Sequence, residues 1–279
     1  MHRFKTFMLM FALILVFITL GGMIAGEDGM IMAFGFAVVL NIFSYWNSDK
    51  IAIKMTKSKP LSEEEAPEIH AMVRRLSNRA KIPMPDIYVT PSNQPNAFAT
   101  GRNPKNAAVA VTRGIMNLLD EDELEGVIAH ELAHIKNRDT LISTIAAVMA
   151  GALAMLARMG RFSMIFGGRR RNNNGGALLQ LLAIIFAPLA AIIIKMAISR
   201  SREYLADQEG ARIAGRSDGL ADALAKMQRR VQGQDMKVNE ATSHMFILNP
   251  ISGRGGLSKL FSSHPPTEDR IQKLRQTRF

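Results

Sequence analysis

The sequence predicts a mainly α-helical integral membrane protein, with about four membrane-crossing helices and an α+β domain that contains a small β-sheet. Three observations carry this prediction. Of the 279 residues, 48% are hydrophobic, and many of these lie in long uncharged runs. Short β-compatible stretches separated by turn residues lie between two of the runs. A His-Glu-x-x-His motif at residues 130–134, outside the apolar runs, is typical of a metal-binding helix in a catalytic domain.

Composition narrows the classes of function. The chain has no cysteine, so any transition metal must be held by histidines and carboxylates. The formal net charge is +11, and the lysines and arginines cluster beside hydrophobic runs, where anionic lipid headgroups attract them. No interleaved aromatic residues or nucleic-acid-binding motif accompany the basic residues. We therefore expect a lipid bilayer as a partner and no nucleic acid.

The first two apolar runs predict a helical hairpin. Phe7–Ala25 and Met30–Trp46 each approach the length of roughly 20 residues that crosses a bilayer, and only four residues separate them. A cleavable signal peptide is the alternative for the first run, because Arg3 and Lys5 resemble a charged n-region. The second run, which follows at once, favours the hairpin. Basic residues at both flanks then place these flanks in the cytoplasm and the turn outside.

The next segment predicts one helix and a small sheet. Ser62 and Glu65 have the spacing of a capping box, which would open an amphipathic helix that continues to about Arg79. Three β-compatible stretches follow, at residues 87–89, 97–99 and 107–111. The edge of such a sheet could bind an extended peptide as an added strand, through backbone hydrogen bonds. A purely structural hairpin is the alternative.

The His-Glu-x-x-His motif is the strongest chemical signal. His130 and His134 are four residues apart, so on a helix both imidazoles can reach one metal ion about 2 Å away. Glu131 is placed to act as a base on water that the metal activates. Acidic residues from Leu118 onward favour the start of a helix before the motif. A surface helix with two solvated histidines is the alternative reading.

A catalytic zinc site needs a third protein ligand, because such sites usually combine three protein ligands with one water position. Glu203 and Asp207 are also four residues apart and share one face of a helix. Glu203 can therefore ligate the ion, while Asp207 accepts the N–H of a ligand histidine.

Two further apolar runs lie between these half-sites. We expect the motif helix to continue through Arg138 and Asp139 into Leu141–Leu156, and Gly175–Ile194 to return antiparallel to it. This arrangement would bring the three ligands to the cytoplasmic side of the membrane. The basic residues Arg169–Arg171 in the connection oppose the positive-inside rule. Either the first hairpin dominates the topology, or these two runs do not both cross the bilayer.

Three predictions concern the C-terminal part. An amphipathic helix is expected from Gly219 to Arg230, with an apolar face that core packing explains, and a last helix from Ile271 to Arg275. Gly253–Gly256 predicts a flexible loop near the cleft.

In order and combination these motifs resemble the HtpX-like membrane metallopeptidases, relatives of the CaaX prenyl proteases. The resemblance runs over nearly the whole chain, through Asn96-Ala97-Phe98, the histidine motif, Glu203 to Asp207 and His264-Pro265-Pro266, with hydrophobic segments between them. It implies a zincin-type catalytic domain that holds one Zn²⁺ per chain, with Asn96, Ala97 and Phe98 on an active-site strand.

The resemblance also assigns a role to His264 and Arg270. In the CaaX relatives, a histidine and an arginine with this spacing lie near the scissile carbonyl, where either residue could stabilise the developing oxyanion. The alternative for Arg270 is a capping contact or salt bridge of the last helix.

The expected function is zinc-dependent hydrolysis of peptide bonds in misfolded or damaged membrane proteins. The family resemblance implies stress-related quality control in a bacterial inner membrane, with the catalytic site and both termini in the cytoplasm and a homo-oligomer possible. The alternatives are a specific processing protease and a metal-stabilised scaffold or holdase without turnover. The expected divisions are residues 1–50, the first hairpin; 51–140, the first half of the catalytic domain; 141–198, the second hydrophobic pair; and 199–279, the second half.

Overall fold

The structure is a computed structural model of the chain, and it describes residues 2–141, 145, 200–232, 247 and 265–277. This part of the chain is mainly helical and contains one small mixed sheet, as the sequence predicts. The helices are α1 (His2–Trp46), α2 (Ser48–Met55), α3 (Pro67–Ala80), α4 (Arg113–Leu118), α5 (Glu121–Asn137), α8 (Arg200–Ala214), α9 (Asp218–Gln232) and α10 (Thr267–Gln276). The strands are β1 (Lys59–Pro60), β2 (Asp86–Thr90), β3 (Ala97–Asn103) and β4 (Asn106–Thr112).

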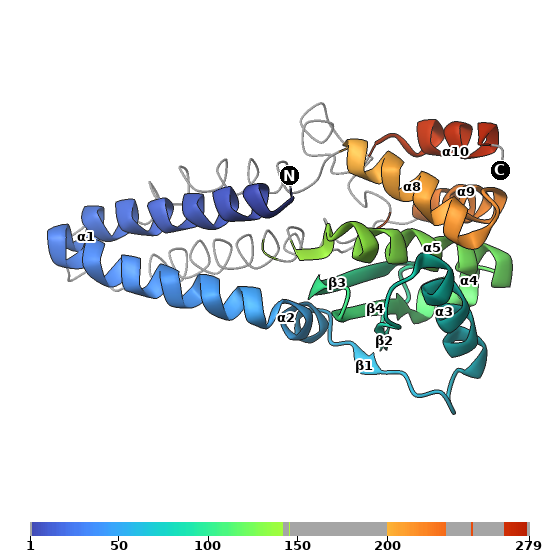
Figure 1. Cartoon of the computed structure of the whole chain (residues 1–279), viewed down its shortest axis with the longest axis horizontal. Helices are drawn as coiled ribbons and strands as arrows, with labels where there is room; N and C mark the ends of the chain where they lie inside the picture. The colour runs from blue at the N-terminus through green and yellow to red at the C-terminus, as the bar shows by residue number, and fades with distance from the viewer. Residues whose placement is uncertain (1, 142–144, 146–199, 233–246, 248–264, 278–279) are drawn as a thin grey trace, which may run out of the picture.

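Helix α1 folds back on itself as the predicted hairpin and projects away from the rest of the molecule (Figure 1). The reversal lies at Gly26, whose φ of +61° is in the left-handed region that glycine tolerates. Between the two arms, the Asn41 side-chain amide donates to the Met10 carbonyl over 3.2 Å. Gly26–Trp46 is long and apolar enough to cross a membrane, whereas the first arm contains a shorter apolar stretch, Met10–Thr19.

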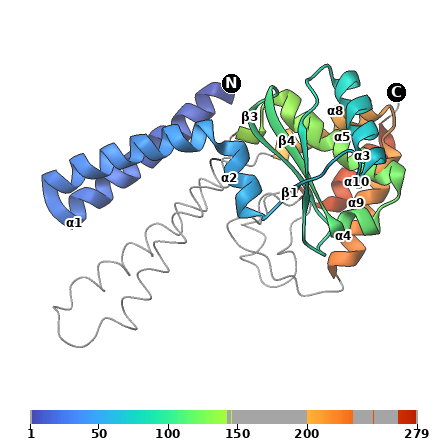
Figure 2. The same cartoon turned by 90° about the horizontal axis from the view of Figure 1, so that it is seen from below.

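The four strands form a sheet in the order β1-β2-β4-β3, which confirms the three predicted strands and adds the short β1. Strands β2 and β4 run parallel, and the other neighbours are antiparallel. Strand β3 therefore lies at an edge (Figure 2). An edge strand leaves one row of backbone N–H and C=O groups without a strand partner.

Helix α5 is the central element of the domain. It packs against β3 and β4 on one side, and against α8 and α9 on the other, while α10 covers α8 and α9 (Figure 1). Helix α2 covers the opposite face of the sheet, where Phe98 and Ala110 pack against Ala52. The predicted amphipathic helix is confirmed as α9, whose apolar face is fully buried and comprises Leu220, Ala223, Leu224 and Met227.

The predicted start of the first amphipathic helix is wrong by several residues. The Ser62 hydroxyl and the Glu65 side chain do exchange the two hydrogen bonds of a capping box, at 3.3 and 3.1 Å. They close a turn, however, and α3 begins only at Pro67. Proline lacks a backbone N–H and has a helical φ, so it suits the first position of a helix.

The predicted continuation of α5 into the next apolar run is also wrong. The helix ends at Asn137, because Arg138 adopts the left-handed conformation with φ +59°. At its other end, α5 begins at Glu121 after the N-cap Asp120, separately from α4, which ends at Leu118. The last helix, α10, is longer than predicted.

Several predictions concern residues outside the described part of the chain. These are the spans Leu141–Leu156 and Gly175–Ile194, apart from Leu141 and Ile145, together with Arg169–Arg171, Gly253–Gly256 and His264. The division of the chain at residues 50, 140 and 198 stays a prediction.

Candidate metal centre

Helices α5 and α8 bring the three predicted metal ligands to one point. His130 Nε2 and His134 Nε2 lie 3.2 Å apart. Glu203 faces both of them, with its carboxylate oxygens 3.8 Å from His130 Nε2 and 3.6 Å from His134 Nε2. His130 and Glu203 are buried. Each residue therefore offers one donor atom to a common centre.

These separations fit a tetrahedral zinc ion. Zinc bonds of about 2.0–2.1 Å to nitrogen and oxygen place neighbouring ligand atoms about 3.4 Å apart. The 3.2 Å between the two histidine nitrogens, and the 3.8 and 3.6 Å from each of them to a different oxygen of Glu203, lie on either side of this value. The Nδ1 atoms of both histidines face carboxylates, so both Nε2 lone pairs can point to the centre. Three protein ligands leave a fourth position for water or substrate.

Asp207 contacts His130 at the ring nitrogen Nδ1, opposite the proposed metal-binding Nε2, and Arg270 holds Asp207. Asp207 Oδ1 lies 3.0 Å from His130 Nδ1, as the spacing of Glu203 and Asp207 suggested. The fully buried Arg270 holds both carboxylate oxygens of Asp207, through Nη2 at 2.7 Å and Nε at 2.9 Å. Burial alone would raise the pKa of Asp207, but the Arg270 charge and the hydrogen bonds to His130 and Arg270 lower it to about 2. Asp207 is therefore charged in the folded protein.

Glu131 lies beside the cluster and contacts the edge strand. The Ala99 backbone N–H donates to Glu131 Oε2 over 2.8 Å. Burial raises the pKa of Glu131 to about 7, with Glu203 adding to the rise while His134, Ala99 and Arg270 oppose it. A carboxylate with a pKa near neutrality can both accept and return a proton at physiological pH, as general acid-base chemistry requires.

Asp139 and Arg202 are part of the centre but were missed from the sequence. Asp139 Oδ2 lies 3.3 Å from His134 Nδ1, and Arg202 Nη1 lies 3.6 Å from Asp139 Oδ1. Burial lowers the pKa of His134, but the hydrogen bond that its Nδ1–H donates to Asp139 and the charges of Glu203 and Glu131 outweigh this effect and raise the pKa to about 9. The signal that could have found Asp139 was a carboxylate shortly after the motif, if the helix had been expected to end there.

Of the predicted substrate-binding residues, Ala97 and Phe98 begin β3 and Asn96 directly precedes it, but the side chains of all three contact other parts of the protein. The Asn96 side-chain oxygen accepts from the Ile247 backbone N–H over 2.9 Å. Ala97 is buried in the main core, and Phe98 packs against Ala52 of α2. The contact of this strand with Glu131 is made by its backbone, through the Ala99 N–H.

The Arg270 guanidinium, on α10, contacts Asp207 and lies near Glu203, both on α8. Its Nη1 donates to the Ile247 carbonyl over 3.1 Å and lies 4.0 Å from Glu203 Oε2. Burial lowers the pKa of Arg270, but the charge of Asp207 and its hydrogen bond raise it overall. The guanidinium is thus a fixed cation between α10 and α8.

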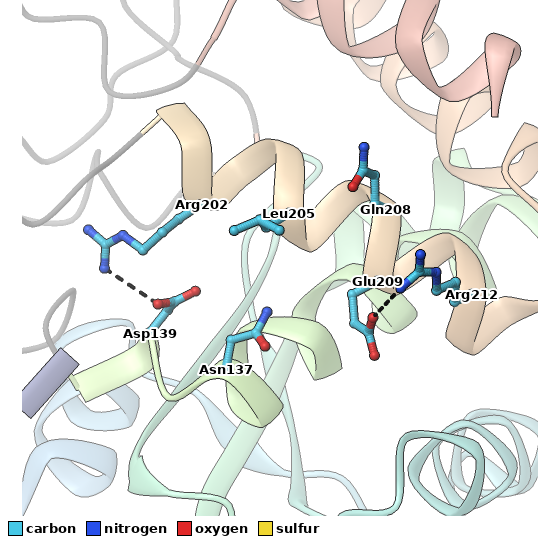
Figure 3. A pocket seen from close by; sticks show the side chains of 7 residues that line it. All are labelled: Asn137, Asp139, Arg202, Leu205, Gln208, Glu209 and Arg212. Atoms are coloured by element: carbon cyan, nitrogen blue, oxygen red, sulfur yellow. Dashed lines mark ion pairs between the residues drawn. The ribbon is translucent and has the colours of Figure 1, made fainter. Parts of the chain in front are cut away.

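A small cavity of about 160 Å³ lies beside the metal centre, between the end of α5 and the start of α8 (Figure 3). The metal ligands do not line it. Asp139 lines the cavity and also contacts the metal ligand His134. The lining residues are Asn137, Asp139, Arg202, Leu205, Gln208, Glu209 and Arg212.

Comparison with known proteins identifies the family. The sequence model of peptidase family M48 matches residues 63–278. The chain belongs to peptidase family M48. Its relatives include a protease HtpX homolog of Pelotomaculum thermopropionicum, 54% identical over 98% of both chains. Another, from Salinibacter ruber, is 53% identical over 99% of this chain and 98% of the relative.

A solved structure supports the fold of this M48 chain. The crystal structure of S. mikatae Ste24p is similar with a TM-score of 0.52, at 20% sequence identity, over 98% of this chain and 65% of Ste24p. At this identity the likeness concerns the fold alone. The family membership and the HtpX relatives together support a membrane metalloprotease, and they bear out the resemblance noted in the sequence.

Proposed function

We propose that the chain is a zinc-dependent endopeptidase, with His130, His134 and Glu203 as the zinc ligands and Glu131 as the general base. The observation that carries this proposal is the convergence of three donor atoms, one from each residue, within 4.8 Å of one another. The two histidine nitrogens lie 3.2 Å apart, near the spacing that tetrahedral zinc requires. Membership of family M48 supports it.

Bound zinc would activate a water molecule and polarise the scissile carbonyl. The protein supplies the proton transfers. Glu131 accepts a proton from the attacking water and then gives it to the leaving amine, and its raised pKa suits both steps. The Ala99 N–H holds the carboxylate of Glu131 at the end of the edge strand.

The substrate would bind in an extended form along the outer edge of β3. The Asn96 carbonyl accepts from the Thr112 N–H, so the backbone polar groups of Asn96 point toward β4. In an antiparallel pair, these groups point toward the partner strand and away from it in alternate residues. The Ala99 N–H, three residues later, accordingly points away from β4 and donates to Glu131. Backbone hydrogen bonds at this edge would be independent of the substrate's sequence. Unfolded segments of many proteins could therefore bind.

We keep His264 and Arg270 as candidates for stabilising the developing oxyanion. Arg270 already donates to Asp207 and to the Ile247 carbonyl. These contacts favour a supporting role for Arg270 and leave His264 as the better candidate for the direct contact.

The proposed setting is a bacterial inner membrane, with four crossings and with the centre and both termini in the cytoplasm. The substrates would be misfolded or damaged membrane proteins, cut in their cytoplasmic segments, as quality control under stress requires. The HtpX relatives and the apolar arm Gly26–Trp46 support the membrane setting.

The test uses the full chain, purified in detergent with a chelator and then loaded with zinc. The parent should cut an unfolded polypeptide only with zinc, and Glu131→Gln should bind zinc equally well without cutting. One equivalent of zinc bound by a parent that cuts no polypeptide would favour a metal-stabilised scaffold or holdase. Cutting at a single site of one substrate would favour a specific processing protease.

A further inference from the structure

The chain makes a turn directly after α5, and this turn brings a second carboxylate to the metal centre. The backbone N–H groups of Arg138 and Asp139 donate to the Ile135 and His134 carbonyls at 3.1 and 3.0 Å. The left-handed φ of +59° at Arg138 costs a non-glycine residue about 1 kcal/mol or more. As a result, Asp139 Oδ2 lies 3.3 Å from His134 Nδ1 instead of continuing along a helix.

A buried arginine lies behind this carboxylate. Arg202 projects from the first turn of α8 toward Asp139, and its Nη1 lies 3.6 Å from Asp139 Oδ1 (Figure 3). Only 8% of the Arg202 side chain is exposed. Within the described part of the chain, none of its three guanidinium nitrogens has a hydrogen-bond partner. A buried cation needs an anion nearby, and Asp139 is the anion that the described residues place there.

The same arrangement occurs on the other histidine. His130 Nδ1 contacts Asp207, which the buried Arg270 holds. Each ligand histidine is thus backed by an aspartate, and each aspartate by a buried arginine from another helix. We infer that Asp139 and Arg202 are positioning residues for the metal ligand His134, as a counterpart of Asp207 and Arg270 on His130.

The physical role follows from the imidazole. A carboxylate at Nδ1 fixes the proton on that nitrogen, which leaves the Nε2 lone pair for the metal and sets the plane of the ring. The positive charge of Arg202 attracts the Asp139 carboxylate and holds it beside His134. Thr140 joins the same turn to the edge strand, because its hydroxyl donates to the Gly101 carbonyl of β3 over 2.8 Å. The turn at residues 138–140 therefore fixes the metal ligand relative to the edge strand.

The inference rests on the proposed metal site and is tested by metal binding without turnover. Zinc affinity is measured on the full chain in detergent by competition with a chelator, and Co²⁺ is used as a spectroscopic probe. Asp139→Asn should bind zinc 10- to 100-fold more weakly, as outer-shell substitutions commonly do, and should change the visible spectrum of bound Co²⁺. Arg202→Met should weaken binding in the same direction, and Arg202→Lys should restore part of the loss.

The controls separate positioning from general destabilisation. Asp222→Asn and Arg275→Met each break an exposed Asp–Arg pair that joins α9 to α10, and both should keep the affinity and the Co²⁺ spectrum of the parent. If Asp139→Asn does not fold, the double variant Asp139→Leu with Arg202→Met removes both charges together, which is better tolerated. Parent-like affinity and spectrum in Asp139→Asn, or in that double variant, would overturn the inference. A parent that binds no zinc would instead refute the proposed function itself.

Discussion

The two ligand histidines differ in how tightly their Nδ1 atoms are held. His130 meets Asp207 at 3.0 Å, and Arg270 fixes that aspartate with two short hydrogen bonds. His134 meets Asp139 at 3.3 Å, and Arg202 stands 3.6 Å further on. Burial lowers the pKa of His130, whereas Asp139 and Glu203 raise that of His134 above its usual value. His134 is therefore the ligand that carries a proton when the metal is removed.

This difference predicts how zinc affinity depends on pH. The pKa of His134 is raised to about 9, so zinc must displace one proton from it at any lower pH. Apparent affinity should rise by up to about tenfold per pH unit between pH 7 and 8.5, and level off near pH 9. Calorimetry in buffers of different ionisation enthalpy should show about one proton released per zinc. An affinity that is constant over this range would contradict the assignment.

A second prediction concerns the buried pair of Asp207 and Arg270. Arg270→Met leaves the Asp207 carboxylate buried without its cation, and such losses cost about 3–5 kcal/mol. Denaturant unfolding of the metal-free protein measures the loss. The matched control is Arg275→Met, whose partner Asp222 is 51% exposed, so its cost should stay below about 1 kcal/mol. Equal losses in the two variants would contradict the expectation that Asp207 is left as an uncompensated buried charge.

The sequence was informative about residues wherever helical spacing alone decides the geometry. His130 and His134, and likewise Glu203 and Asp207, are each four apart on one helix, and the structure brings them together. Asp139 could not be placed in this way. Its contact with His134 depends on a left-handed Arg138, a conformation that its residue type does not favour.

At the scale of elements, the spacing of α5 and α8 sets the ligand geometry. The two helices approach so closely at Gly210 that a Cβ atom there would lie 2.9 Å from the backbone N and Cα of His130. Glycine therefore lets α8 bring Glu203 and Asp207 within reach of α5. Gly126 and Gly219 allow a similar approach between α5 and the start of α9.

Gly210→Ala should separate α5 from α8 and thereby disturb both stability and metal binding. Overpacking of this kind costs about 1–3 kcal/mol, and Glu203 should move away from the histidines, so zinc binds more weakly. Gly35→Ala is the control, because a Cβ at Gly35 meets nothing within 4 Å. Unfolding curves and chelator competition measure the two effects. Parent-like zinc affinity in Gly210→Ala would show that the close approach does not set the ligand geometry.

Element types were predictable, but their ends and neighbours were less so. Short β-compatible stretches between turn residues predicted three strands, yet the order β1-β2-β4-β3 depends on contacts between distant parts of the chain. The capping box at Ser62 forms, but Pro67 is the first helical residue of α3 because proline favours that position. Helix α5 ends where tertiary contacts of Asp139 and Thr140 favour a turn.

At the scale of the whole molecule, the edge strand is attached to the end of the apolar hairpin. The Arg102 guanidinium donates to the Trp46 carbonyl over 2.8 Å and lies 4.9 Å from the centre of its ring. The Thr100 hydroxyl donates to the Ser48 carbonyl over 3.3 Å. These contacts place β3 next to the end of the apolar arm Gly26–Trp46 (Figure 1). A substrate at this edge would lie close to the membrane surface.

Cysteine labelling tests the proposed topology, because the chain has no cysteine of its own. With four crossings, Asp28→Cys and Asn173→Cys should react with a membrane-impermeant reagent from outside the cell, and Lys57→Cys should react only after the membrane is opened. The reason is that Asp28 would follow one crossing and Asn173 three crossings, which places both outside. Lys57 would follow two crossings, which returns it to the cytoplasm. If Asn173→Cys behaves like Lys57→Cys, the second apolar pair does not cross the bilayer.

The most direct test of the proposed zinc centre is X-ray absorption at the zinc edge, together with metal content, for the parent and for Glu203→Ala. We predict one zinc per chain in the parent, with a first shell of two imidazole nitrogens and oxygen ligands at about 2.0–2.2 Å. Glu203→Ala should lose most of its zinc. A parent without stoichiometric zinc, or a Glu203→Ala variant with an unchanged first shell, would contradict the assignment of His130, His134 and Glu203 as the metal ligands.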